Sequence, residues 1–199
     1  MRLKIIGGLI AAAVLATPAL AQDAPENAPP APSFTGFRVE GLLGWDHTEI
    51  LDDDQGGLMY GLGVGYDFQT GRAVLGIEAE ASDSRNNGCL SDLIQAGDRF
   101  CSGTGRDLYI GGRAGLLVGR NVLLFGKAGF VNTRVTNEYD PGGGGAVTRA
   151  RFDQNGLRVG MGAELAIGRN AFVRGEARYT SYREGGDRGA LLGGFGFRF

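Results

Sequence analysis

The chain has 199 residues with 20 basic and 22 acidic side chains, which gives a formal charge of −2 at neutral pH. A mildly acidic chain without a basic stripe excludes nucleic acid as a natural partner. The length favours a single domain. Glycine is over-represented, at 37 residues against a usual share of about 7%, which argues against long helices and leaves strands and turns.

The N-terminal segment has the features of a secretory signal peptide. Arg2 and Lys4 give it a positive start, residues 5–16 are apolar, and residues 17–21 supply a small-residue cleavage site. The apolar run is too short for a membrane-spanning helix, which needs about 20 residues. We therefore predict a signal peptide over residues 1–21, with a short N-terminal anchor helix as the alternative.

A proline-rich stretch follows the predicted cleavage site. Residues 22–33 hold four of the six prolines in the chain and few side chains that could be buried. This composition predicts a disordered Pro/Ala-rich linker. The folded domain is therefore expected to comprise residues 34–199.

From Phe34 onward the dominant period is two, because apolar residues alternate with glycine and charged residues. A period of two is typical of strands whose two faces meet different surroundings. Only one proline, Pro141, lies in this part of the chain, which suits continuous hydrogen-bonded strands. The alternation predicts eight strands, at residues 37–46, 58–68, 73–82, 108–118, 122–131, 157–167, 171–180 and 191–199.

The predicted connections alternate between short and long. Short turns are expected at residues 69–72, 119–121 and 168–170. Long polar loops are expected at residues 46–57, 83–106, 137–151 and 183–189. Short turns at one end and long loops at the other are typical of an eight-stranded antiparallel up-and-down transmembrane β-barrel, and this is the fold class we predict.

The two faces of these strands differ in charge. One face is uncharged through its middle, as a lipid-facing surface must be, because an Arg or Lys at the bilayer midplane costs about 2–4 kcal/mol. The other is rich in glycine and is expected to line the lumen as a network of paired charges. Its charged members are Arg38, Glu40, Glu78, Glu80, Arg113, Lys127, Arg158, Glu164, Arg174, Glu176, Arg178 and Arg198.

An eight-stranded ring is barely wide enough for its own side chains. The inward glycines leave volume for the long arginines, which favours a filled interior over an open pore. A small passive channel is the alternative. A secreted soluble β-sandwich or lipocalin-like barrel is a further alternative, but its interior would be mainly apolar and its outer face would carry many charges.

The end of the chain, Gly-Gly-Phe-Gly-Phe-Arg-Phe, carries the most specific pattern. Leu191, Phe195, Phe197 and Phe199 lie at every second position, with a gap at Gly193. With the signal peptide, the spacer and the alternating strands, this ending resembles the small outer-membrane β-barrel proteins of Gram-negative bacteria. The nearest resemblance is to the opacity-protein-like, "porin family" barrels of alphaproteobacteria.

This resemblance implies a location in the cell outer membrane, with periplasmic termini and four extracellular loops. It implies that the outer-membrane assembly machinery recognises the last strand. The lipid bilayer and lipopolysaccharide are the other expected partners, and the protein is expected to be a monomer. The expected role is structural, in envelope integrity and surface interaction, with no catalytic residues, cofactor or metal.

Cys89 and Cys101 are the only cysteines, and both lie in the second predicted loop. Two cysteines in one exposed loop of a secreted chain predict a disulfide. Two free thiols or a metal-binding pair are the alternative.

His47, the only histidine, lies at the predicted barrel mouth. Because some barrels of this kind modify lipid A, His47 could act as a general base with Ser82, Asp83 or Ser84 as partners, and an enzyme of this class is the less favoured functional alternative. The sequence shows no fixed motif for such an enzyme, so a rim histidine is preferred.

Two loop segments invite a ligand-binding interpretation. Glu49 and Asp52–Asp54 make the first loop acidic, but their spacing matches no calcium loop, and a solvated acidic loop is preferred. The four glycines at 142–145 lack the Lys-Ser/Thr and the helix of a phosphate loop, so a mobile surface loop is expected there.

Outward aromatic residues fall near the strand ends. In an outer-membrane barrel, such residues form the girdles that lie at the two membrane–water interfaces. The residues in question are Trp45, Tyr60, Tyr66, Phe68 and Tyr179.

Overall fold

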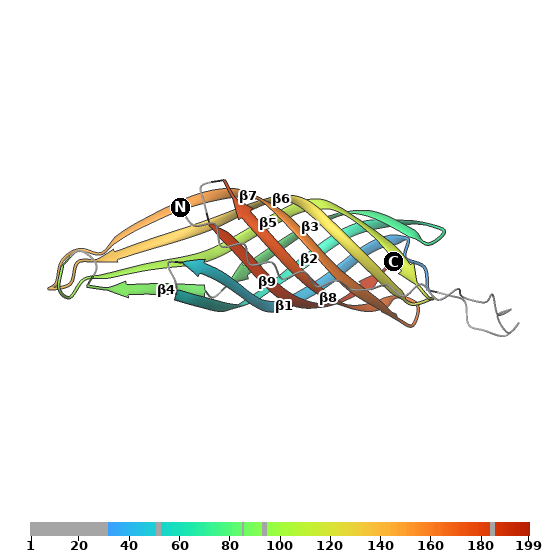
Figure 1. The fold of residues 1–199 in the computed structure, drawn as a ribbon, viewed down its shortest axis with the longest axis horizontal. Helices are drawn as coiled ribbons and strands as arrows, with labels where there is room; N and C mark the ends of the chain where they lie inside the picture. The colour runs from blue at the N-terminus through green and yellow to red at the C-terminus, as the bar shows by residue number, and fades with distance from the viewer. Residues whose placement is uncertain (1–31, 51–52, 85, 93–94, 184–185) are drawn as a thin grey trace, which may run out of the picture. The chain divides into compact units, whose positions relative to one another are not determined.

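A computed structural model of the chain describes residues 32–50, 53–84, 86–92, 95–183 and 186–199. This part of the chain forms nine β-strands (Figure 1). The strands are β1 Gly36–Ile50, β2 Asp53–Thr70, β3 Ala73–Ser84, β4 Asn86–Ser91, β5 Arg99–Val118, β6 Val122–Asp140, β7 Thr148–Ile167, β8 Ala171–Tyr182 and β9 Asp187–Arg198.

Eight of the strands close into a ring. All neighbours are antiparallel, and the order runs β3-β2-β1-β9-β8-β7-β6-β5, with β3 pairing back to β5. Strand β4 lies outside the ring and pairs only with the outer part of β5 among the described strands. The prediction of an eight-stranded antiparallel barrel is therefore confirmed, with one short strand added.

The connections at the long-strand end differ from the prediction. Strands reach into all four segments expected to be loops, since β1 runs to Ile50, β5 begins at Arg99, β6 runs to Asp140, β7 begins at Thr148 and β9 begins at Asp187. The predicted loops 46–57, 83–106, 137–151 and 183–189 were therefore too long. Polar and small residues on both faces conceal the alternation there, but cross-strand backbone pairing still extends the ladders.

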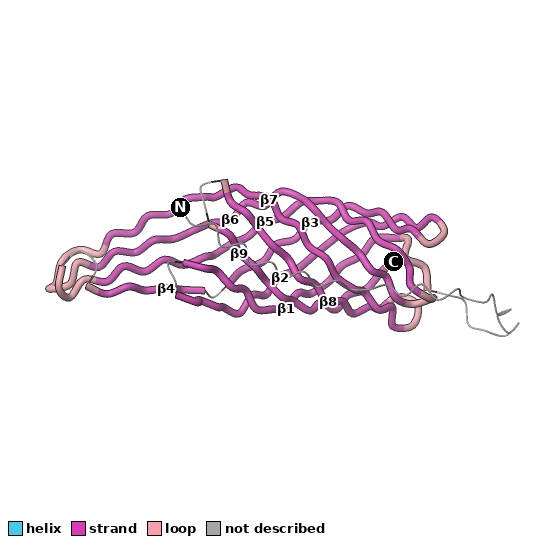
Figure 2. The backbone as a smooth tube through the Cα atoms, viewed as in Figure 1, coloured by secondary structure: helices cyan, strands magenta, loops and turns pink. Residues whose placement is uncertain are grey.

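Strands β5, β6 and β7 continue beyond the ring as a sheet, and β4 pairs with β5 at the edge of this sheet. We call the sheet made of β4, Arg99–Gly105, Arg134–Asp140 and Thr148–Asn155 the extension. It projects at the left of Figure 1, and the loops at its tips are seen in Figure 2. The tips are linked, because the side-chain amide of Gln95 donates to the Pro141 carbonyl over 2.7 Å.

The other end of the ring has tight turns. Gly71, Gly119 and Gly168 adopt positive φ angles of 59°, 72° and 70°, a left-handed conformation that glycine reaches without steric cost. These glycines lie in the three turns that the sequence predicted to be short.

The last strand closes the ring against the first. Phe197 lies opposite Val39 and Phe195 lies opposite Gly41. The Phe199 amide donates to the Phe37 carbonyl over 2.8 Å, so the pairing continues to the final residue.

No helix among the described residues is long and apolar enough to cross a membrane. The predicted signal peptide and nearly all of the predicted linker lie outside the described residues.

Candidate functional site: a charged interior and an extension beyond the ring

Charged side chains line the inside of the ring. All twelve charged residues that the sequence assigned to the inner face have relative exposures of 0–5%. Their neighbours on the other face are exposed apolar residues such as Leu62, Ile77 and Met161. The buried face is therefore the charged one, the reverse of the arrangement in a soluble protein.

Four further charged residues lie inside: Asp46, Asp67, Asp107 and Arg188, with exposures of 0–5%. The sequence had assigned five acids and seven bases to the interior. The structure adds three acids and one base, so the interior holds eight described acids and eight described bases. Asp46 and Asp67 occupy inward positions of the predicted alternation. The excess of bases over acids in the predicted charge network was a signal that further acids lie inside. Asp107 lies between the predicted loop 83–106 and the strand predicted to begin at residue 108, and Arg188 lies in the predicted loop 183–189.

Near the short turns, two carboxylates hold three arginines together. Asp67 accepts from Arg113 at 2.6 Å and from Arg198 at 2.9 Å, with Arg38 Nε at 3.3 Å. Glu164 binds the same two guanidinium groups, Arg113 at 3.0 Å and Arg198 at 2.8 Å. Five strands are therefore joined across the lumen by one ionic cluster.

In the middle of the ring, Lys127 and Arg174 share a group of glutamates. Lys127 Nζ lies 3.0 Å from Glu78 and 3.1 Å from Glu176. Arg174 lies 2.7 Å from Glu176 and 3.0 Å from Glu80. Each cation contacts more than one carboxylate, so desolvation of these charges is offset by several partners at once.

At the mouth of the ring, toward the extension, Asp107 accepts two bonds from Arg158, at 2.9 and 2.7 Å. Arg188 bridges Asp107 and Asp46. Asp46 also accepts from the Ser84 hydroxyl over 2.7 Å. Ser84 therefore donates its hydroxyl to a paired carboxylate, a structural arrangement rather than that of an activated nucleophile.

Inward glycines make room for these long side chains. A Cβ on Gly76 would lie 2.1 Å from Asp67 Oδ1, and one on Gly63 would lie 2.8 Å from Glu40 Oε1. These are close approaches that any side chain would disrupt. The glycine content of the inner face therefore has a packing cause.

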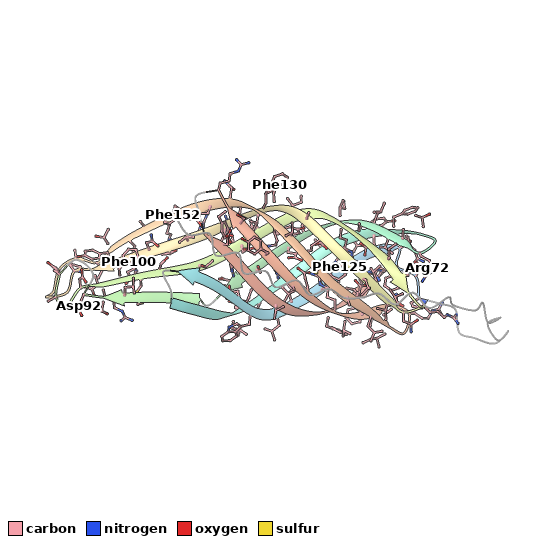
Figure 3. All side chains as sticks on the ribbon, viewed as in Figure 1. Arg72, Asp92, Phe100, Phe125, Phe130 and Phe152 are labelled. Atoms are coloured by element: carbon pink, nitrogen blue, oxygen red, sulfur yellow. A yellow bond between two sulfur atoms is a disulfide. The ribbon has the colours of Figure 1, made fainter. Side chains whose placement is uncertain are left out.

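An apolar layer fills the ring beside the short turns. Arg198 lies over the Phe34 and Phe172 rings, at 5.0 and 5.2 Å from their centroids, and so connects the layer to the ionic cluster above it. Phe125 is labelled within the ring in Figure 3. The layer consists of Phe34, Val74, Leu117, Leu123, Phe125, Ala166 and Phe172, all less than 9% exposed.

The outside of the ring is an apolar band. Trp45, Tyr60, Tyr66, Phe68 and Tyr179 are all exposed on it, with relative exposures of 43–58%. Phe130 also projects away from the ring (Figure 3).

The C-terminal residues lie on this band as well. Leu191, Phe195, Phe197 and Phe199 are exposed by 45–73%, whereas Arg198 points inward. The rings of Phe195 and Phe197 meet edge to face with centroids 5.1 Å apart.

Cys89 and Cys101 form a disulfide between β4 and β5. The bond lies within a strand pair rather than in a loop. It holds β4, which has no other paired strand among the described residues, to the rest of the extension.

The faces of the extension are the reverse of those of the ring. Thr133 of β6 is buried inside the ring, and alternation places Val135, Asn137 and Tyr139 on the same side of the strand. The residues of neighbouring strands that lie opposite these three share that inner side. This inner side carries no formal charge in its described side chains: Leu90, Phe100, Ser102, Thr104, Val135, Asn137, Tyr139, Thr148, Ala150, Phe152 and Gln154.

The outer side of the extension carries the charges. Arg134 Nε lies 3.0 Å from Asp153, and Arg149 Nε lies 2.8 Å from Glu138. The register shift between Thr104 and Asp107 keeps β5 in phase with this pattern, because one extra residue there exchanges its two faces.

Several sequence-predicted candidates cannot be placed. The side chains of His47, Glu49 and Asp52–Asp54 lie outside the described residues. The four glycines at 142–145 lie in the β6–β7 tip, between two strands and without a helix.

The outer-membrane protein beta-barrel domain model matches residues 8–199. The chain belongs to this outer-membrane β-barrel family. It resides in the cell outer membrane, where its apolar band meets lipid. Searching the curated proteins finds no sequence relative.

Solved structures show the same fold. The attachment invasion locus protein Ail of Yersinia pestis aligns with a TM-score of 0.55 at 12% identity, covering 83% of this chain and 99% of Ail. Neisserial surface protein A aligns with a TM-score of 0.55 at 14% identity, covering 83% and 98%. Ail in complex with the heparin analogue sucrose octasulfate aligns with a TM-score of 0.51 at 13% identity, covering 82% and 99%.

Proposed function

We propose that the protein is a non-conducting structural barrel that supports envelope integrity and presents the extension at the cell surface. The observation that carries this proposal is the burial of the sixteen interior charges, none more than 5% exposed. Side chains that line a water-filled channel are wetted, as in porins. The paired, dry interior supports a stable wall rather than a passage for solutes.

The apolar layer supports the same conclusion at one end of the lumen. Any ion that crossed the ring would have to pass Phe125, Leu117 and Leu123, which are less than 9% exposed. An ion in such surroundings loses its hydration without gaining ligands. The ionic clusters and the apolar layer are thus two barriers in series.

Conductance in planar bilayers tests this proposal. Purified protein should give no current steps above background, at protein amounts that saturate incorporation. Heat-denatured protein from the same preparation controls for contaminating porins. Reproducible current steps that vanish on denaturation would contradict the proposal and favour a small passive channel.

The role in envelope integrity needs a separate measurement. A strain without the protein should become more sensitive to bile salts and to SDS, and wild-type protein should restore resistance. Protein carrying Arg113→Ala should restore it poorly, because that variant loses the contacts to Asp67 and Glu164. Unchanged sensitivity in the deletion strain would argue against the envelope role.

The orientation we propose places the short turns and the C-terminus in the periplasm and the extension outside. The outward aromatics would then lie at the two interfaces, and lipopolysaccharide would contact the outer half of the apolar band. Protease added to intact cells should cut within residues 92–98 or 141–147 and leave the three short turns intact. Cleavage at residues 119–121 instead would reverse the orientation.

The last strand is also the proposed recognition signal for the assembly machinery. The Phe199 amide and carbonyl both bond to Phe37, but the Phe199 ring is 73% exposed, so the ring contributes little to packing within the chain. Removing Phe199 should therefore lower outer-membrane levels in cells more than it lowers stability after refolding in detergent. Phe199→Tyr, which keeps an aromatic terminus, is the matched control. Normal membrane levels of the truncated chain would defeat this idea.

A further inference from the structure

One edge of the extension is a strand without a neighbour. Strand β8 pairs with β7 only from Gly156 onward. Outside that point, Thr148–Asn155 pairs with β6 on one side and with no described strand on the other. Residues 148–153 are all exposed. Such an edge presents a row of unpaired N–H and C=O groups to any further strand.

The backbone groups that face this open edge can be assigned. The Arg183 amide donates to the Asn155 carbonyl, so Asn155 points its backbone toward the β8 side. In an antiparallel ladder, alternate residues point the same way. Arg149, Arg151 and Asp153 therefore direct their N–H and C=O groups to the open edge, while their side chains lie on the outer face of the extension.

The charges along this edge are self-complementary. Arg151 and Asp153 are two residues apart on the same face, and no ion pair joins Arg151 to any described residue. When an identical edge is laid antiparallel with Phe152 opposite Phe152, Arg151 of each copy lies opposite Asp153 of the other. Two reciprocal ion pairs then flank an aromatic pair, whereas an edge of uniform charge would repel its copy.

We propose that β7 edges of two copies pair in this way and join barrels that stand in two opposing membranes. Strand β7 runs from the tip of the extension toward the membrane, so antiparallel pairing places the two membranes on opposite sides of the joint sheet. The occupant of the edge is thus a second copy of this chain. The inference rests on the proposed function, because it needs the extension to face out of the cell.

The pairing register follows from the same alternation. Arg151 and Asp153 form hydrogen-bonded pairs across the joint, since both point their backbone groups to the edge. Phe152 meets Phe152 of the second copy as the intervening non-hydrogen-bonded pair, in which side chains approach most closely. The Arg134 guanidinium donates to Asp153 and holds the pKa of that carboxyl below its ordinary value, which keeps it ionised.

One joint of a few residue pairs is weak, because exposed ion pairs contribute little. Two membranes that each carry many copies can form many joints at once, and multivalency then raises the overall affinity without new contacts. Vesicle aggregation is therefore the appropriate readout.

The test uses full-length protein folded into preformed phosphatidylcholine vesicles, with turbidity and light scattering as measurements. Wild-type vesicles should aggregate. Vesicles with Arg151→Asp alone should stay dispersed, because two carboxylates then face each other at each ion pair. Vesicles with Asp153→Arg alone should also stay dispersed, because two guanidinium groups do. Mixing the two variant populations should restore aggregation, since each new charge then meets its opposite.

Arg169→Asp is the matched control, because it makes the same charge change in the turn at the other end of the ring. This variant should aggregate like wild type, and heat-modifiable gel mobility verifies that every variant is folded. Dispersed wild-type vesicles would overturn the proposal and leave an extended segment of another protein as the occupant of the edge. Aggregation by either single variant, or no rescue on mixing, would also overturn it.

A cysteine at position 152 tests the register independently of charge. Phe152→Cys should give a disulfide-linked dimer when vesicles aggregate, because this position lies on the symmetry axis of the joint. Gln154→Cys should not cross-link to itself but should cross-link to Ala150→Cys in a mixture. Self-cross-linking at 154 would rule out this register. A conducting barrel in planar bilayers would instead count against the proposed function and leave the aggregation results unaffected.

Discussion

The ring and the extension are made of the same strands but have opposite faces. In the ring, β6 buries Lys127 and exposes Phe130 to lipid. In the extension, the same strand turns Arg134 and Glu138 outward and Val135 inward. The alternation of side chains along β6 does not change at the rim, so the surroundings must change. We interpret the rim as the point where strands leave hydrocarbon and enter water.

The ring and the extension also contain two different kinds of ion pair. Interior charges are shielded from water and share several partners, as Arg113 does with Asp67 and Glu164. The pairs of the extension are exposed and mostly single, as for Arg149 with Glu138. Removing a member should be costly in the first case and nearly neutral in the second. Four sets of substitutions test the differences between the ring and the extension, in order of decreasing expected cost.

Arg113→Ala should destabilise the ring by about 3–5 kcal/mol, because it leaves two buried carboxylates short of a partner. Arg134→Ala removes an arginine from the exposed Asp153 pair and should leave the unfolding midpoint unchanged. Urea unfolding of protein folded in vesicles measures both. Equal effects of the two substitutions would remove the distinction between interior and extension.

Met161→Arg should cost about 2–4 kcal/mol, because it places a charge on the lipid-facing band. Met161 is 71% exposed there. Ser91→Arg introduces the same side chain on the exposed surface of β4 and should have no effect on stability. The free energy of folding into vesicles is the quantity to compare. Tolerance of arginine at 161 would mean that this face does not meet hydrocarbon.

Gly76→Ala should destabilise the ring by about 1–3 kcal/mol through overpacking, since the added Cβ meets Asp67. Gly175→Ala is the matched control, because a Cβ at that position has no atom within 4 Å. Unfolding midpoints under identical conditions give the comparison. A similar loss in both variants would point to backbone propensity instead of interior volume.

Replacing both Cys89 and Cys101 with Ser should leave the unfolding midpoint of the ring unchanged. The closed loop is expected to stabilise the extension locally by about 2–3 kcal/mol on the chain-entropy estimate. Limited proteolysis should therefore cut the variant faster near residues 92–98, with the ring fragment still resistant. A lower unfolding midpoint of the ring would show that the extension and the ring unfold as one unit.

The sequence was sufficient for the ring because its faces differ sharply in polarity. Arg38, Glu78 and Arg174 alternate with apolar residues, and a period of two leaves only one arrangement that keeps charge out of lipid. Asp46 and Asp67 also occupy inward positions in this pattern. Because the predicted inner face had more bases than acids, these two acids could have been added to the predicted charge network. The long arginines could be placed inside only because glycines such as Gly63 and Gly76 lie beside them.

The extension could not be predicted in the same way. Both of its faces meet water, so residues such as Ser102, Thr104 and Asn137 give no contrast between sides. The register shift between Thr104 and Asp107 also exchanges the faces of β5. A strict period of two therefore cannot be followed along the whole of this strand. Which strand edge stays open depends on where β8 ends, and that is a property of the whole sheet.

The reversal of faces at the rim is tested most directly by tryptophan quenching with brominated lipids. The chain has a single tryptophan, Trp45, so in a Trp45→Phe background one new tryptophan can be placed at Leu62 or at Arg151. We expect strong quenching for Leu62→Trp, on the outer face of the ring, and none for Arg151→Trp, on the outer face of the extension. Equal quenching at the two positions, or quenching only at position 151, would contradict this expectation.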